Sequence, residues 1–222
     1  SSPKIKEGLS ILFHNADAML FFLLVLVVGI SSGVIENFAY VRMREVGGTG
    51  REMGISRMVS SSSGVPMFWF SDKLIGRTEN AATRVLILAL LSYAARFFIY
   101  ATMKSPLAGL PAEALRGATF GAFWSTATVY AHRISPPGMS ATMLTFLNAM
   151  YGGLGQSTGA IIGGKLQSRF GTVNTFKIGC AADLGFVCVY LLCTSVSRYR
   201  RRRLMMEAGE KEGETGGMIK QQ

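Results

Sequence analysis

Long apolar segments are the feature that most restricts what this chain can fold into. The clearest of them reads AMLFFLLVLVVGI, at residues 18–30. A helix of about 20 predominantly apolar residues is long enough to cross the hydrocarbon core of a bilayer. Six segments meet this rule, at residues 16–41, 52–75, 82–103, 107–133, 138–168 and 174–197. The sequence therefore predicts an all-α fold, a polytopic membrane bundle of six transmembrane helices.

The composition favours a membrane protein over two other classes. Charged residues make up 16% of the chain, against about 25% in soluble domains. The formal net charge is +10, but the densest basic cluster, SRYRRRRL at residues 197–204, directly follows the last apolar segment. Such a cluster is typical of a cytoplasmic anchor facing anionic lipid. A soluble protein and a nucleic-acid-binding protein are both disfavoured.

The chain divides into three parts on the same criteria. We expect a cytoplasmic segment or linker at residues 1–15, a six-helix transmembrane domain at 16–197, and a basic and then disordered cytoplasmic tail at 198–222. An even number of spans places both ends on one side of the membrane. The arginine cluster assigns that side to the cytoplasm.

The fourth apolar segment carries two charges near its start, Glu113 and Arg116. A charge at the centre of a membrane helix costs about 2.5 to 3.5 kcal/mol on insertion scales, so such groups usually face a bundle interior or a water-filled cavity. Their spacing places both on one helix face, where they can pair, along with Phe120 and Trp124. Two interpretations stay open. The pair is a structural device near the outer interface, or this face lines the pathway of a solute or ion.

Other charged and polar residues within the spans are candidates for the same pathway. Glu36 and Asn37 lie in the first span, and Arg96 lies deep in the third. The structural alternative for Glu36 is an interface position paired with Arg42 or Arg57. For Arg96 the alternative is a partner carboxylate on a neighbouring helix.

The fifth span carries uncharged polar groups and regularly spaced glycines. The polar groups either join helices or contact a polar solute; they are Asn148, Tyr151 and Gln156. Asp183, in the sixth span, is expected to be structural. Small residues every fourth position predict flat faces for close helix packing; they are Gly155, Gly159 and Gly163, with Gly117 and Gly121 in the fourth span.

No grouping of residues in the sequence indicates an enzyme. There is no Ser, His and Asp grouping and no phosphate-binding loop, and the two histidines, His14 and His132, lie near span ends. The cysteines at positions 180, 188 and 193 match no zinc spacing. We therefore expect no catalytic residue, no metal and no cofactor.

Several stretches carry a family resemblance. SDKLIGR (71–77) resembles the loop motif of the major facilitator superfamily, with Asp72, Lys73, Gly76 and Arg77 fitting and one extra residue before the glycine. Farther on, GATFGAFW, SPPGMSAT, GLGQSTGAIIGG and RFGTVNTF follow in order between residues 116 and 176. They are similar to the branch that contains lactose permease and the major facilitator domain-containing protein 6 group. The resemblance covers about residues 10–197.

The resemblance implies half of a major facilitator fold, helices seven to twelve of twelve. In lactose permease the helix equivalent to 107–133 carries charged and histidine residues used in proton coupling, and an arginine matched by Arg96 takes part. Here Arg116 aligns with a histidine, so that chemistry does not carry over intact. Gly64 also stands where the related group often has an acidic residue, before Val65 and Pro66.

The function implied is secondary active transport of a small polar solute, sugar-like or other, by alternating access, with proton symport as an open option. The expected partners are the solute, protons, membrane lipid, and either a missing N-terminal six-helix half or a second copy of the chain. The alternative is a non-transporting membrane receptor or scaffold on the same fold. Lipid-facing or fully enclosed positions of Glu36, Glu113 and Arg116 would favour that alternative.

Overall fold

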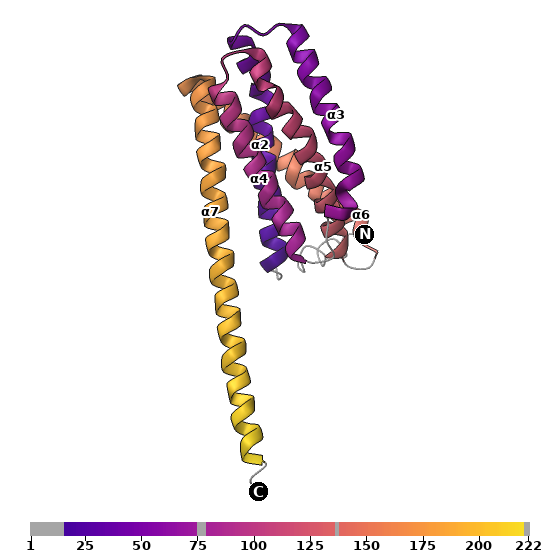
Figure 1. Cartoon of the computed structure of the whole chain (residues 1–222), viewed down its shortest axis with the longest axis vertical. Coiled ribbons are helices and arrows are strands. Elements are labelled where there is room, and N and C mark those ends of the chain that lie inside the picture. The colour runs from indigo at the N-terminus through magenta and orange to yellow at the C-terminus, as the bar shows by residue number, and fades with distance from the viewer. Residues whose placement is uncertain (1–15, 75–78, 136–137, 220–222) are drawn as a thin grey trace. The chain divides into compact units, whose positions relative to one another are not determined.

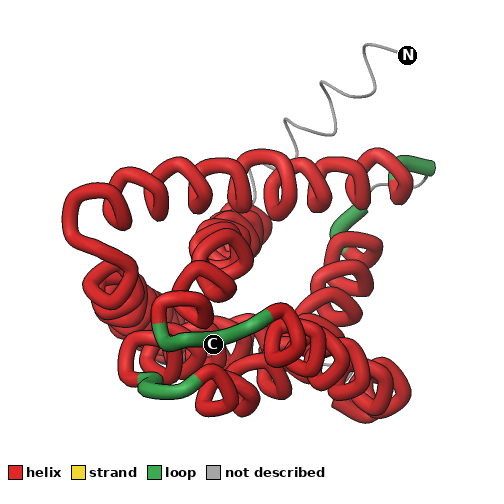
Figure 2. The backbone as a smooth tube through the Cα atoms, turned by 90° about the horizontal axis from the view of Figure 1, so that it is seen from above, coloured by secondary structure: helices red, strands yellow, loops and turns green. Residues whose placement is uncertain are grey.

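The computed structural model describes residues 16–74, 79–135 and 138–219, with side chains at 18–64, 84–117, 119–135 and 138–192. Every regular element in these residues is helical, and Figure 2 shows only short loops between the helices. This confirms the predicted all-α class for the described residues. In chain order the elements are α2 (Ala16–Glu45), α3 (Gly50–Leu74), α4 (Glu79–Thr102), the 3₁₀ helix η1 (Pro106–Gly109), α5 (Leu110–Arg133), α6 (Ser140–Asn148), the π-helix η2 (Ala149–Gln156) and α7 (Ser157–Ile219).

The long helix α7 contains a break at Gly171. This glycine has φ 78° and ψ 166°, so α7 consists of two helices joined at a kink. Glycine adopts a positive φ without the steric cost that other residues meet. The kink falls between the fifth and sixth predicted spans, at the place where the sequence predicts a connection. The backbone stays helical up to Ile219, within the tail for which the sequence predicts disorder. Helix formers such as Leu204, Met205 and Glu207 favour this conformation locally.

The chain forms two compact units, residues 1–184 and 185–222. In the first unit α5 packs against α3 and α4, and α2 packs against η2 and α4. Figure 1 shows α2, α3, α4 and α5 with their axes roughly aligned, and consecutive helices run in opposite directions. The core of this unit is mainly apolar, with buried polar groups such as Arg96 and Glu113. Aromatic rings pack between α4 and the helix after the kink. The rings of Tyr100 and Phe176 stack with centroids 5.5 Å apart.

Three helical stretches are long and apolar enough to cross a membrane: Ala18–Glu45, Arg84–Thr102 and Ser140–Leu192. The last has 53 residues and contains the kink, so it has the length of two spans. The helices α3 and α5 have 25 and 24 residues, but serines and charged residues lower their apolar character. Exposed side chains on α4, such as Leu88 and Phe98, are apolar, as contact with lipid requires.

An arginine of α2 binds the C-terminal end of α4. Arg42 donates hydrogen bonds to the carbonyl oxygens of Tyr100 (3.3 Å) and Met103 (3.0 Å), and it pairs with Glu45 (3.1 Å). Unpaired carbonyls at a helix C-terminus need such donors. Arg42 therefore has a structural task, and it is not a partner of Glu36.

Candidate functional site

Four residues from four helices meet inside the bundle, and we call them the polar junction: Glu36, Ser60, Arg96 and Arg116. Arg116 of α5 donates from Nε to Oε1 of Glu36 on α2 at 2.6 Å. Nη2 of Arg96 on α4 lies 3.5 Å from the same oxygen. Arg116 also donates from Nη1 to Ser60 Oγ on α3, at 2.9 Å. One carboxylate therefore serves two guanidinium groups.

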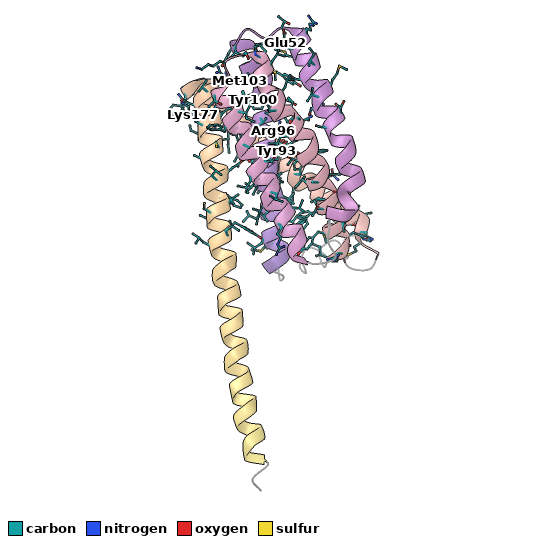
Figure 3. The ribbon with its side chains drawn as sticks, in the orientation of Figure 1. Glu52, Tyr93, Arg96, Tyr100, Met103 and Lys177 are labelled. Atoms are coloured by element: carbon teal, nitrogen blue, oxygen red, sulfur yellow. The ribbon has the colours of Figure 1, made fainter. Side chains whose placement is uncertain are left out.

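The junction is enclosed on one side and open on the other. The side chain of Arg96 is 1% exposed, whereas those of Arg116 and Glu36 are 25% and 27% exposed. The guanidinium carbon of Arg96 lies 5.3 Å from the ring centroid of Tyr93. Its Nε has no hydrogen-bond partner among the described residues. Figure 3 shows Tyr100, Arg96 and Tyr93 along α4, with Met103 and Glu52 nearer the end where α3 begins.

Glu113 has a separate, buried partner. Its residue is 3% exposed, and Tyr100 donates its hydroxyl hydrogen to Oε1 at 2.5 Å. Oε2 of Glu113 is buried and has no partner among the described residues. Glu113 is therefore held through one oxygen, by a residue of α4 outside the polar junction.

The prediction that Glu113 pairs with Arg116 is wrong for this structure. Among the residues with described side chains, no ion pair joins the two, because Arg116 binds Glu36 and Glu113 binds Tyr100. Three residues along a helix with 3.6 residues per turn leave the side chains about 60° apart around the axis. That angle is enough to turn Glu113 toward α4 and Arg116 toward α2 and α3.

Aromatic rings continue the face of α5 beyond Arg116, and we call Phe120, Trp124 and Tyr151 the aromatic platform. The rings of Phe120 and Trp124 stack with an interplanar angle of 9° and centroids 6.0 Å apart. Tyr151 of η2 lies 5.6 Å from Trp124, measured between centroids. Phe120 is 39% exposed and Trp124 is half-buried, so part of the platform is accessible.

The polar groups of the fifth predicted span face two different ways. The hydroxyl of Tyr151 donates to Ser32 Oγ at 3.0 Å, and Gln156 Nε2 donates to the same atom at 3.3 Å. These bonds join η2 to α2. Asn148 is exposed and donates to its own helix, at Leu144 O (3.0 Å). A π-helical segment often marks a functional site, and here it carries Tyr151 and Gln156.

Asn37 and Asp183 lie outside the polar junction. Asn37 is exposed and its amide donates to Gly33 O of the same helix at 2.7 Å. Asp183 is buried and accepts a hydrogen bond from Ser31 Oγ at 2.6 Å, which joins α2 to the helix after the kink. This is the structural position that the sequence predicts for Asp183.

The glycines of the fourth and fifth spans lie at close helix contacts. A Cβ on Gly155 would lie 2.8 Å from Gly29 Cα, and one on Gly159 would clash with the carbonyl oxygen of Ile30. A Cβ on Gly163 would meet the ring of Phe38 at 2.7 Å. On α5, a Cβ on Gly117 would lie 2.7 Å from the amide nitrogen of Gly64, and Gly121 is buried on the same helix.

Other predicted residues lie outside the described part of the structure or apart from the junction. Gly76, Arg77, His14 and the side chains of Asp72, Lys73 and Cys193 are not described. His132 bonds Ser140 at 2.9 Å at the end of α5. Among the described residues, no group of His, Cys, Asp and Glu could hold a metal ion.

Sequence reasoning did not single out Ser60, Tyr93 or Tyr100 as parts of the site. The signal for the tyrosines is the spacing of residues 93, 96 and 100, which places them with Arg96 on one face of α4. The signal for Ser60 is the run of four serines at 60–63 inside a predicted membrane helix.

Comparisons with known proteins identify related chains. The model of the MFS_1 like family matches residues 2–178. A major facilitator superfamily domain-containing protein 6-like protein B from Xenopus laevis is 25% identical over 191 residues, which are 86% of this chain and 31% of the relative. A protein 6-like relative from Danio rerio is 26% identical, over 89% of this chain and 36% of its own length. A maltose permease from Geobacillus stearothermophilus is 29% identical, over 72% of this chain and 41% of its own length.

The chain spans 31% to 41% of the length of these relatives. The predicted likeness to the protein 6 group is confirmed by the first two, whereas the likeness to lactose permease stays a prediction. The family model covers most of the chain, and several helices have the length and composition of membrane spans. The protein therefore belongs to the MFS_1 like family of the major facilitator superfamily, as an integral, multi-pass membrane protein.

Proposed function

We propose that this chain forms the C-terminal six-helix half of a secondary transporter, helices seven to twelve of a twelve-helix fold. In this assignment α2, α3, α4 and α5 are four spans, and the kink at Gly171 divides the remaining helical stretch into two. The N-terminal half, or a second copy of the chain, supplies the opposite wall. A small polar solute then binds between the halves near the membrane midplane, and rocking of the halves gives alternating access.

The polar junction is the observation that carries this proposal. Glu36 and Arg116 are each about one quarter exposed, and Glu36 lies on a helix that is long and apolar enough to cross a membrane. Charged side chains in a membrane usually face a bundle interior or a water-filled cavity rather than lipid. An open, charged patch shared by four helices fits the wall of a solute pathway. The glycine contacts between α2 and η2 support the proposal, because smooth faces allow helices to slide.

We further propose that transport is coupled to protons and that Glu113 carries the coupled proton. Glu113 is buried beside Tyr100, and one of its oxygens has no partner among the described residues. It lies three residues from Arg116 on the same helix. Loss or gain of its proton would change the net charge next to the solute site, which is what coupling requires.

Thiol accessibility in the full-length protein tests alternating access. In a background without Cys180, Cys188 and Cys193, Asn37→Cys places a thiol one residue from Glu36. We expect an impermeant thiol reagent to reach it from either face of the membrane, in proportions that change when a solute binds. Leu88→Cys is the matched control, because this exposed apolar residue of α4 would face lipid and stay unreactive.

The same measurement decides the alternative function. The full burial of Glu113 is also what a non-transporting receptor or scaffold with an enclosed core would show. Reaction of Asn37→Cys from one face alone, in every condition tested, would contradict alternating access and favour that alternative.

A further inference from the structure

We propose that the solute is a small organic monoanion, a carboxylate with an apolar ring or ring-like body. Its carboxylate would bind at Arg57 and Arg116, and its body would lie on Phe120 and Trp124. The proposal rests on the transport function proposed above, because it names the solute class of the same site.

The first argument is an imbalance of charge. Arg57 precedes Ser60 by three residues on α3, and Ser60 accepts a hydrogen bond from Arg116, so Arg57 lies within one helical turn of the polar junction. Glu113 lies three residues from Arg116 on α5. Arg96 adds a third arginine through Glu36. Three arginines face two glutamates, and one positive charge is left over even when both carboxylates are ionised.

No carboxylate of α3 restores the balance. The helix has no Asp or Glu from Met53 to Phe70, and its serines and Gly64 occupy the part next to α5. Arg57, which is exposed on α3, has no ion-pair partner among the residues with described side chains. Its guanidinium is therefore free to meet an incoming anion.

The second argument is the number of unused hydrogen-bond donors. Each guanidinium carries five N–H donors, and the described contacts of Arg116 use Nε and Nη1. This use leaves three N–H donors on Arg116, whose side chain is 25% exposed. A solute carboxylate accepts several such bonds at once, with the fork geometry that arginine favours.

The third argument is the position of the aromatic platform. Phe120 and Trp124 follow Arg116 by one and two helical turns on the same face of α5. At 1.5 Å per residue they lie about 6 and 12 Å along the axis from Arg116. Their stacked rings give a flat apolar surface that is partly exposed. A ring next to a carboxylate, in a molecule of this length, would cover both features.

Other solute classes fit these features less well. A cationic solute would meet the surplus positive charge and be repelled. A neutral sugar would stack on the platform and accept hydrogen bonds from the arginines, but it would leave the surplus positive charge uncompensated. The single negative charge of one carboxylate neutralises the one surplus positive charge.

The experiment measures the melting temperature of the purified full-length protein at constant ionic strength. The carboxylate probes are 3-phenylpropionate, cyclohexanecarboxylate and glucuronate. Matched controls are 3-phenylpropanol, which is neutral, 3-phenylpropylamine, which is cationic, and maltose. We expect at least one ring carboxylate to raise the melting temperature in a saturable way, and its matched controls to have little effect. Equal stabilisation by the neutral or cationic probes, or no stabilisation by any carboxylate, would overturn the proposal.

Variants then locate the effect. Arg57→Gln should weaken binding of the active carboxylate at least about tenfold while the protein stays folded, because Arg57 has no ion pair to lose. Arg133→Gln removes the same charge at the far end of α5 and should leave binding unchanged. Phe120→Ala should weaken binding, and Phe98→Ala, at an exposed ring on α4, should not. If Arg57→Gln and Arg133→Gln weakened carboxylate binding equally, the effect would be one of general charge, and the assignment of the carboxylate to Arg57 would be contradicted.

The two proposals fail in different ways. Stabilisation by maltose and not by the carboxylates, together with alternating reactivity of Asn37→Cys, would support transport and contradict the proposal of an anionic solute. Carboxylate binding together with reactivity of Asn37→Cys from one face only would support the anion site and contradict alternating-access transport.

Discussion

Arg116 Nε and Glu36 Oε1 lie 2.6 Å apart although the two residues are separated by 80 positions in the chain. Their contact joins α5 to α2 within the polar junction. Glu36 Oε1 also lies near Arg96, so this one carboxylate contacts both arginines, whereas each arginine contacts one carboxylate. This asymmetry leaves arginine donors available and makes the two residues unequal in any mutational test.

Glu113→Gln should separate proton coupling from folding. The amide oxygen can still accept the hydrogen bond from Tyr100, so we expect a near-normal surface level. An amide does not exchange a proton at physiological pH, so uptake driven by a proton gradient should fall at least about tenfold, or about 1.4 kcal/mol in the barrier. Equilibrium exchange of the solute, which needs no net proton movement, should persist. The measurement is uptake of the active carboxylate into proteoliposomes with and without an imposed gradient.

Tyr100→Phe is the matched variant for this prediction. It removes the hydrogen bond to Glu113 and keeps the carboxyl group. We expect gradient-driven uptake to survive with an altered pH dependence. Unchanged gradient-driven uptake by Glu113→Gln would show that Glu113 has a structural role alone.

Substitution at the glycine contacts should destabilise the bundle according to the space at each position. Gly159 lies against the backbone of α2, so Gly159→Val would force the helices apart. Overpacking costs about 1–3 kcal/mol in soluble cores, and a clash with backbone belongs at the upper end. Gly152 has no atom within 4 Å of a built Cβ, so Gly152→Val introduces the same side chain into open space. Melting temperatures that fall equally for both would contradict the close contact.

The sequence alone predicts the elements of the fold better than the partners within the site. Apolar segments near the length of the bilayer predict α2 and α4 within a few residues, and RFGTVNTF contains the glycine at which α7 bends. These are local properties of the chain. The partner of Arg116 is a property of packing, because a rotation of about 60° on the helix decides whether α2 or α4 is faced. Sequence spacing therefore favours a Glu113–Arg116 pair, and the structure gives each residue a partner on another helix.

The C-terminal tail should lie in the cytoplasm. The arginines at 198–203 follow the last apolar segment and outweigh the basic residues in the other connections. A peptide tag placed after Gln222 should stay unlabelled by an impermeant reagent on intact cells and become labelled after permeabilisation. As a control, replacement of Arg200 to Arg203 by glutamine should weaken this preference. Labelling of the unaltered protein on intact cells would reverse the orientation of every helix.

Glu36→Gln should damage folding more than Arg116→Gln does. Removal of Arg116 leaves Glu36 with Arg96 as a partner, whereas removal of the Glu36 charge leaves two arginines together, one of them almost fully buried. Breaking a buried pair by removing one partner costs about 3–5 kcal/mol when the remaining charge is uncompensated, and the quarter exposure of Glu36 and Arg116 lowers that figure. We expect a clear loss of surface level for Glu36→Gln and a near-normal level for Arg116→Gln. Adding Arg96→Gln to Glu36→Gln should restore part of the loss, because the buried charge is then removed. Surface level and melting temperature of the three variants check the prediction. Equal losses for the two single variants would show that Glu36 contributes no more to the stability of the junction than Arg116 does.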